Sequence, residues 1–336
     1  MNSVKPKILV ASYAFWPSLG GLELIAEHLA RGLSARGHAL ELITFTPPPE
    51  GGENRPWPFR MTRRPGLRQS LAAFRNADVV ISKHLSLRTC WPVLLIRRPL
   101  IVWHATWYPK DERLITRTLR RWIMRRARNI ANSHAMGAAL ERCDGVVHPG
   151  YDETSYRNEI PWGSRPRSFV YVGRLGLEKG VDLLIDALPA LPAVDLTVVG
   201  SGPAETQLKA QAQQLGVTAR VDFVGRKNSC EINEILNQHK VMVAPSRYAE
   251  PFGTVALEGQ AAGCRVVVSS GGGFPEAAGP GGIVFANGDL AALSSAMQEA
   301  LRPADPALAK AISDHLHSHR IESFVNAFEA MTVSLR

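Results

Sequence analysis

The sequence predicts an α/β protein of two parallel-sheet domains, and three observations lead to that prediction. Strand-like and helix-like segments alternate along most of the 336 residues. The alternation breaks at 161–168, where Pro, Gly and Ser accumulate, and then restarts. Glycine-rich turns follow strand-like segments in both halves. A chain of this length, 45% of it hydrophobic, can bury two cores, and we expect domains at 1–162 and 163–336.

The elements of the two halves follow from hydrophobic periodicity and helix-end signals. The first half begins with a buried strand, an amphipathic helix closed by Gly37 and a second strand, at 7–15, 21–37 and 39–45. Further strands are predicted at 78–83, 100–105 and 129–133. In the second half, strands are predicted at 169–175, 195–200, 221–225, 241–246 and 264–270, with helices at 180–191 and 205–216. Ligands of such sheets bind beyond the carboxyl ends of the strands, so we expect the substrate in the cleft between the domains.

Composition limits the compartment and the partners. No apolar run reaches the roughly 18 to 20 residues of a membrane span, and the chain starts directly with a strand pattern, which predicts a cytoplasmic protein. The four cysteines, Cys90, Cys143, Cys230 and Cys264, form no C-x-x-C pair and suit reduced thiols better than a zinc site.

The positive charge is concentrated in one region. Residues 60–128 hold 17 Lys or Arg against 3 Asp or Glu, a local charge of +14, so the remainder of the chain carries −5. The densest part, 113–129, reads as a helix with seven arginines and the apolar Leu114, Ile115, Leu119, Trp122, Ile123 and Met124. Such a helix can dock on anionic lipid headgroups, although a solvated face with an apolar stripe in the core is the alternative interpretation.

Three glycine-rich turns lie at strand ends. Gly20 and Gly21 precede the first helix, where their amides can approach an anion. The turn at 172–180 contains Gly173 and adds two cations, Arg174 and Lys179, which suit a diphosphate. The turn at 199–205 contains Gly200 but lacks the third glycine of a dinucleotide fingerprint, so it is weak evidence for NAD.

Two glutamates eight positions apart flank a Pro-Phe-Gly turn in the stretch AEPFGTVALEGQAAG. Glu250 is predicted on a loop after a strand, and Glu258 about one turn inside the following helix. Carboxylates accept hydrogen bonds from vicinal hydroxyls, so a nucleotide sugar would satisfy both. The alternative interpretation makes Glu250 a turn residue and Glu258 a charge favoured by the helix dipole.

The pattern E-x-F-G-x-x-x-x-E resembles the signature of the retaining family 4 glycosyltransferases, which have the GT-B fold of two Rossmann-like, doubly wound domains. Other segments resemble that family in the same order: the first βαβ at 20–44, NSHAM at 132–136, HPGYDETSYR at 148–157, the turn at 172–180 and SSGGGFPEAAG at 269–279. The resemblance implies an acceptor-binding first domain and a nucleotide-sugar-binding second domain. The last helix, at about 318–335, is expected to pack back on the first.

The resemblance also implies roles for the residues at matching positions. Arg174 and Lys179 match the pair that binds the donor diphosphate, Glu258 the glutamate that holds the ribose, and Glu250 the one that contacts the donor sugar. His104, at the end of a first-domain strand, matches a histidine near the reaction centre that acts as charge stabiliser and sugar ligand. The remaining substrate-binding positions supply backbone: Gly20, Gly21, Gly173, Gly200, Phe252, Gly253, Thr254 and Val255. Two departures are Ala105, where many members have Asp, and Pro149, where relatives commonly have Asn.

The implied activity is a retaining, metal-independent transfer of a hexosyl group, with attack on the face from which the leaving group departs. The sequence has no D-x-D motif for a divalent ion on the diphosphate, so the cationic side chains are expected to stabilise the leaving group. No metal and no cofactor are expected. The donor is expected to be a UDP-sugar first and GDP-mannose second.

The basic first domain suggests a glycan or lipid-linked acceptor at the inner membrane surface, in bacterial envelope polysaccharide or lipopolysaccharide synthesis, with peripheral contact to anionic lipid through 60–128. Alternatives remain: a GT-B relative that epimerises or phosphorolyses its substrate, or a non-catalytic membrane-surface protein. Nucleic acid is not an expected partner, because no base-reading motif accompanies the arginine helix.

Overall fold

The computed structural model describes residues 5–18, 21–52, 55–109 and 111–335. It divides into two compact units, residues 1–150 with 321–336 and residues 151–320. Both units are α/β with purely parallel sheets, which confirms the predicted fold class. In the described ranges, no helix is both long enough and apolar enough to cross a membrane.

The sheet of the first unit has the strand order β3-β2-β1-β4-β5-β6-β7. Its strands are β1 (Ile8–Ser12), β2 (Leu40–Thr44), β3 (Arg60–Arg63), β4 (Val79–Lys83), β5 (Leu100–His104), β6 (Arg128–Ala131) and β7 (Gly145–Val146). The order reverses between β1 and β4, which is the topological switch point where doubly wound folds bind ligands. The ends of β1, β4 and β5 therefore carry the candidate residues of this unit.

Helices cover both faces of the first sheet. One face packs on α1 (Gly21–Ala35) and α13 (Ile321–Ser334), and the other on α2 (Leu67–Asn76), α3 (Leu87–Cys90), the 3₁₀ helix η1 (Trp91–Leu94) and α4 (Leu114–Met124). The short α5 (His134–Ala139) follows β6, with Ser133 as its N-cap. The arginine-rich helix predicted at 113–129 is α4, which ends at Met124 because the chain turns into β6 four residues later.

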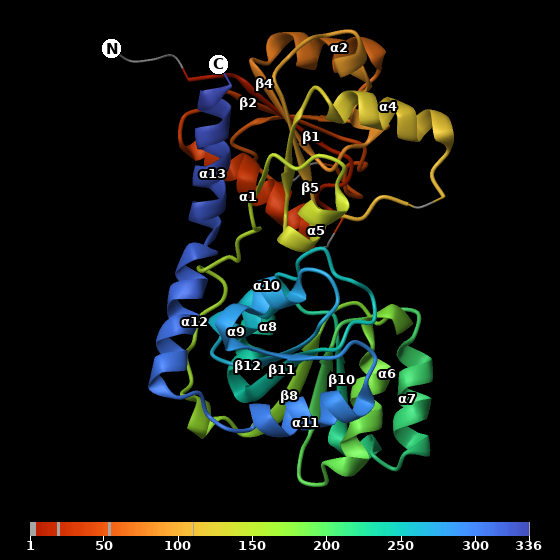
Figure 1. The fold of residues 1–336 in the computed structure, drawn as a ribbon, viewed down its shortest axis with the longest axis vertical. Helices are drawn as coiled ribbons and strands as arrows, with labels where there is room; N and C mark the ends of the chain where they lie inside the picture. The colour runs from red at the N-terminus through yellow and green to blue at the C-terminus, as the bar shows by residue number, and fades with distance from the viewer. Residues whose placement is uncertain (1–4, 19–20, 53–54, 110, 336) are drawn as a thin grey trace. The chain divides into compact units, whose positions relative to one another are not determined.

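The last helix belongs to the first unit although it is the end of the chain. Figure 1 shows α13, in dark blue, beside α1, in red. The rings of Phe324 and Phe328 pack on the buried Trp103 of β5, with centroids 5.1 and 6.1 Å apart. Gly32 of α1 permits this approach, because a Cβ there would lie 2.6 Å from a methyl of Val325.

The sheet of the second unit repeats the same strand pattern, in the order β10-β9-β8-β11-β12-β13. Its strands are β8 (Arg167–Val172), β9 (Leu196–Val199), β10 (Val221–Gly225), β11 (His239–Ala244), β12 (Arg265–Ser269) and β13 (Gly282–Phe285). The helices are α6 (Val181–Ala187), α7 (Glu205–Gln214), α8 (Ser229–Gln238), α9 (Val255–Ala261), α10 (Phe274–Ala278), α11 (Leu290–Ala300) and α12 (Pro306–Ser318). The switch point lies between β8 and β11.

The division between the units falls at Gly150, twelve residues before the boundary at 162 that composition suggests. Residues 151–160 pack on the second unit, because the side-chain carbonyl of Asn237 accepts the backbone N–H of Glu159 at 2.6 Å and of Ile160 at 3.1 Å. Arg165, 2% exposed, donates to the main-chain oxygens of His239 and Ala262. Hydrogen bonds therefore hold the Pro- and Gly-rich stretch in place before β8, and it is not a flexible linker.

Candidate functional site

The carboxyl ends of β8 and β9 meet through two glycines. A Cβ at Gly200, whose φ is +137°, would lie 1.8 Å from the carbonyl oxygen of Gly173, and a Cβ at Gly173 would lie 2.6 Å from the hydroxyl of Tyr171. Both positions therefore require glycine for packing within the second unit. The structure gives Gly200 this packing role whether or not a ligand approaches it.

Two cations follow β8 on the same turn. The side chain of Arg174 is 62% exposed and pairs with Glu178, four positions later. The exposed guanidinium can exchange Glu178 for an anionic ligand with little loss of stability, because surface ion pairs contribute little to the free energy of folding. Lys179 is the last residue of the 3₁₀ turn η3 (Leu177–Lys179), which leads to α6. The next residue, Gly180, has a φ of +73°, and a Cβ there would lie 2.0 Å from the carbonyl oxygen of Pro245, which follows β11.

Lys179 and Glu250, 71 positions apart in the sequence, form an ion pair with Nζ to Oε1 at 2.6 Å. The same carboxylate oxygen accepts the hydroxyl of Ser246 at 3.0 Å. The backbone carbonyl of Glu250 accepts the N–H of Gly273 at 2.7 Å, which fixes the loop after β11. The structure thus brings together two of the residues predicted from sequence, beside the switch point of the sheet.

The turn after Glu250 presents backbone, not side chain. Phe252 is 2% exposed and stacks on the ring of His319, so its side chain belongs to the core. Gly253 has a φ of +99°, and a Cβ there would lie 2.2 Å from the ring of Phe274. Within the described residues, the N–H groups of Gly253, Thr254 and Val255 have no acceptor, as is usual where a helix begins. They are free to donate to a ligand.

Glu258 lies in the first turn of α9 and is half-buried. Burial raises the pKa of its carboxyl to about 7, although hydrogen bonds with the side chains of Thr254 and Tyr156 lower it and Asp152 raises it further. With a pKa near 7, this carboxyl is partly ionised at neutral pH. Hydroxyl groups of a bound ligand that donate to it favour the ionised form.

In the first unit, Gly21 is the first residue of α1, while Gly20 lies outside the described residues. The loop after β1 is anchored by Arg63, which donates to the carbonyl of Trp16 at 2.8 Å. At the end of β4, Lys83 is 8% exposed, and burial lowers the pKa of its amine to about 8.

The structure places His104, the expected sugar ligand, at the buried end of β5. Its side chain is fully buried, and both ring nitrogens have partners: Nε2 lies 3.1 Å from Oδ1 of Asn129, and Nδ1 lies 2.8 Å from the hydroxyl of Tyr108. Burial lowers the pKa of His104 to about 4, so the ring is neutral at physiological pH. A neutral ring with both nitrogens partnered supports a role in positioning its neighbours, and contact between His104 and a sugar stays a prediction.

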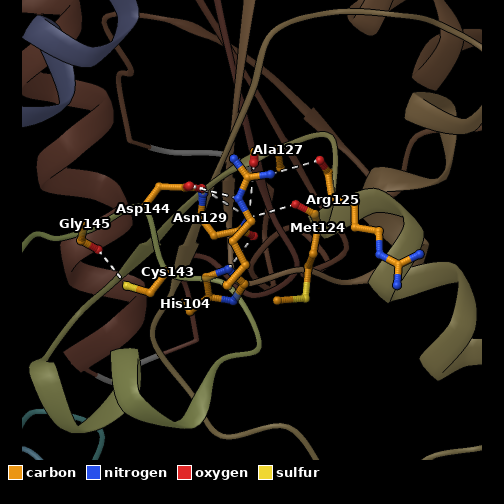
Figure 2. Close-up of polar contacts among 9 residues, drawn as sticks. His104, Met124, Arg125, Ala127, Asn129, Cys143, Asp144 and Gly145 are labelled. Carbon is orange, nitrogen blue, oxygen red and sulfur yellow. Dashed lines mark hydrogen bonds and ion pairs between the residues drawn. The ribbon is translucent and has the colours of Figure 1, made fainter.

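The amide of Asn129 also fixes the tautomer of His104. Its nitrogen donates to the carbonyls of Met124, at 2.8 Å, and Ala127, at 3.1 Å, which leaves Oδ1 as the atom facing the ring (Figure 2). Nε2 of His104 must then carry the proton and donate. Nδ1 is left as the acceptor of the Tyr108 hydroxyl.

Tyr108 connects His104 to a second histidine that sequence reasoning missed. The Tyr108 ring stacks on His84, with centroids 4.4 Å apart, and the guanidinium of Arg120 lies 3.8 Å from the Tyr108 centroid. Both partners lie over the ring, so they must occupy opposite faces of it. His84 follows β4 with a φ of +57°, and burial lowers its pKa to about 3. A half-buried histidine with strained backbone at a strand end is typical of functional sites. The sequence signal was only a Lys-His pair just after a predicted strand.

Known families match both halves of the chain. The model described as Glycosyl transferases group 1 matches residues 135–314, and the one described as Glycosyltransferase Family 4 matches residues 19–155. The first match covers more than half of the chain. The protein belongs to the glycosyl transferases group 1 family. The predicted family resemblance is therefore confirmed.

Curated relatives of this group 1 chain have several activities. It is 36% identical over 206 residues to a glycogen synthase of Mycobacterium tuberculosis, covering 56% of this chain and 49% of the relative. It is 31% identical over 226 residues to a D-inositol 3-phosphate glycosyltransferase of Mycobacterium ulcerans, covering 62% and 47%. The chain thus spans about half the length of the curated relatives it matches.

Solved structures share the whole fold of the group 1 chain. The Anabaena HepE protein in complex with UDP matches with a TM-score of 0.82 at 21% identity, covering 98% of this chain and 100% of that one. Sucrose-phosphate synthase of Thermosynechococcus elongatus matches with a TM-score of 0.78 at 20% identity, covering 98% and 99%. At these identities the likeness establishes the GT-B type of fold.

Proposed function

We propose that the protein transfers a sugar, with retention of configuration, from a nucleoside-diphosphate sugar to a glycan or lipid-linked acceptor. The observation that carries the proposal is the Lys179–Glu250 pair at the carboxyl edge of the second sheet, with Arg174 on the adjoining turn. This edge combines cations for a diphosphate with carboxylates for sugar hydroxyls. Membership of the group 1 family supports the same reaction class.

Breaking the bond between the anomeric carbon and phosphate leaves negative charge on the departing nucleoside diphosphate. Lys179, Arg174 and the free amides of the turn after Glu250 supply positive potential where that charge develops. Because two side-chain cations are available, we propose that the reaction proceeds without a divalent metal. Activity should then persist in EDTA, and restoration by Mg²⁺ after complete loss would contradict this part of the proposal.

The carboxylates have separate roles in the proposed donor complex. Glu250, held by Lys179 and Ser246, is oriented to accept hydrogen bonds from the donor sugar. Glu258, one turn into α9, accepts those of the ribose. We propose a UDP-sugar as the donor and GDP-mannose as the second candidate. The neighbouring HepE structures with UDP and with UDP-glucose support the first choice.

A panel of UDP, GDP, ADP, dTDP and NAD tests the donor class by thermal shift. One nucleoside diphosphate at 100 times its Kd should stabilise the protein by about 2.7 kcal/mol, and NAD should not. If none of the nucleoside diphosphates stabilised the protein, the proposal would be contradicted.

Replacing Lys179 tests the site itself. Lys179→Ala removes a charge-assisted contact to the diphosphate, so affinity for the stabilising nucleotide should fall about ten- to a hundredfold. The matched control is Lys209→Ala, which breaks a surface ion pair with Glu205 on α7 and should leave affinity unchanged. Calorimetric titration distinguishes the two, and equal affinities in both variants would remove Lys179 from the site.

The first unit is the proposed acceptor side, and we propose that it contacts an anionic membrane surface through its basic region, in envelope polysaccharide or lipopolysaccharide synthesis. The +14 charge of residues 60–128 supports this, since each basic residue near an anionic surface contributes ~1 kcal/mol. Wild-type protein should float with vesicles containing phosphatidylglycerol and not with neutral vesicles.

A further inference from the structure

A cavity of about 650 Å³ lies in the first unit, away from the candidate site. It opens where β5 begins, at Pro99 and Leu100, whereas the candidate residue His104 ends the same strand. Its walls come from η1 with the segment that follows it and from the last turn of α4 with Arg126. The candidate site described above does not use this groove.

The groove combines an apolar floor with a cationic rim. The floor residues are apolar and half-buried or buried: Val93, Leu94, Ile96, Leu100, Trp122 and Ile123. The rim carries three exposed arginines, Arg97, Arg98 and Arg126. Among the described residues none of the three pairs with a carboxylate, and the guanidinium of Arg126 lies 3.3 Å from the Trp122 centroid. Arg98 donates to the main-chain oxygen of Arg75, so Arg97 and Arg126 are the rim cations best placed to meet an anion.

The basic region that contains the groove also carries exposed apolar side chains. The four most exposed large apolar side chains among the described residues are Leu67, Leu95, Leu114 and Ile115, at 71 to 78%. All four lie within the basic region 60–128, and Leu95 lines the groove itself. Exposed apolar side chains interleaved with arginines are typical of surfaces that enter the headgroup and acyl boundary of a bilayer.

We propose that this groove binds one anionic phospholipid of the membrane, with its phosphate on the arginine rim and an acyl chain against the apolar floor. The inference rests on the proposed function only in assuming that the first unit meets a membrane. The arginine rim favours an anionic ligand, and the apolar floor favours a lipid over a soluble phosphate. Leu95 then lies beside the bound chain.

Vesicle flotation with two matched double variants tests the groove. Arg97→Gln/Arg126→Gln removes two rim charges, while Arg64→Gln/Arg68→Gln removes two exposed charges of the same region outside the groove. Binding to phosphatidylglycerol vesicles should fall about tenfold or more in the first variant, and clearly less in the second. Equal losses would show a diffuse electrostatic surface and overturn the proposed lipid site.

A soluble lipid separates the site from general membrane attraction. Native mass spectrometry with dihexanoyl phosphatidylglycerol should show one molecule bound to the wild type and none to Arg97→Gln/Arg126→Gln, with glycerol phosphate binding to neither. Binding of glycerol phosphate alone would show an anion site, and binding of neither would show no site; both outcomes overturn the proposal. An acidic peptide that displaced the lipid and bound more tightly would instead identify a protein partner.

Donor binding is measured on the same variants, so that the two proposals fail separately. The groove variants should bind the stabilising nucleoside diphosphate as the wild type does. Lipid binding without any nucleotide binding would contradict the proposed function and leave the lipid site standing. Leu95→Gln should weaken vesicle binding, whereas Val333→Gln, at a 59% exposed position of α13, should not.

Discussion

At the scale of residues, burial decides which titratable groups can act near neutral pH. His104 and Glu258 both lose water, but with opposite results: the histidine becomes permanently neutral, while the carboxyl titrates near pH 7. His104 therefore contacts the Tyr108 hydroxyl as a neutral ring, and we expect Glu258 to be the group whose charge responds to a ligand. The difference follows from which form carries the charge, because burial disfavours the protonated imidazole and the ionised carboxyl alike.

The pH dependence of donor affinity tests Glu258. Because ribose hydroxyls donate to the ionised carboxyl, affinity for a nucleoside-diphosphate sugar should rise about tenfold from pH 6 to pH 8, as the competent fraction rises through a pKa of about 7. Glu258→Gln should bind more weakly and without this dependence. An identical pH profile in both proteins would exclude Glu258 from the ribose site.

The same shift affects the free protein in the opposite sense. Since the folded pKa lies above the ordinary value of 4.5, the protonated carboxyl stabilises the fold. This contribution is complete below pH 4.5 and is lost as the pH rises through about 7. Chemical denaturation between pH 5 and pH 8 should show a smaller pH slope in Glu258→Gln than in the wild type.

At the scale of elements, the candidate site depends on turns that only glycine can form. Gly253 combines a left-handed backbone with close packing on Phe274, and it sets the direction of the free amides that precede α9. The two glutamates on either side of it are oriented by this turn. Their spacing in the sequence alone does not determine where they point.

A pair of glycine substitutions separates backbone strain from packing. Gly253→Ala should lower the free energy of unfolding by more than 2 kcal/mol and weaken donor binding, because left-handed strain of about 1 kcal/mol adds to a clash with the Phe274 ring. Gly288→Ala has a similar φ of +78° but open space around it, so it should cost only the strain. Denaturation and nucleotide titration measure both effects, and equal costs would contradict the packing role.

At the scale of the whole molecule, the chain crosses from the first unit to the second and returns for its last helix. α13 completes the core around Trp103, so the fold of the first unit requires the end of the chain. The second unit, residues 151–320, is continuous and has its own two clusters of buried side chains.

Truncating a buried ring of α13 should therefore loosen the first unit alone. Phe328→Ala is expected to cost about 3 to 5 kcal/mol, and hydrogen exchange should accelerate in α1 and β5 but not in β8 or β9. Val333→Ala, at an exposed position of the same helix, serves as the control and should change neither unit. Uniform acceleration in both units would contradict the separate cores.

The sequence by itself determined the fold class, the central strands, the glycine turns and the glutamate pattern, because these depend on local periodicity and on residues close together in the chain. It missed the short strands β3, β7 and β13, which lack a buried run of their own and form by pairing with a neighbour. Tertiary structure decided the rest. Lys179 meets Glu250 across 71 positions, and α13, which the family resemblance placed on the first domain, packs there against the buried Trp103. The surroundings of His104 depend on tertiary structure for the same reason. Its position at a strand end was local information, whereas its burial and neutral tautomer depend on Asn129 and Tyr108, which reach it from β6 and the loop after β5.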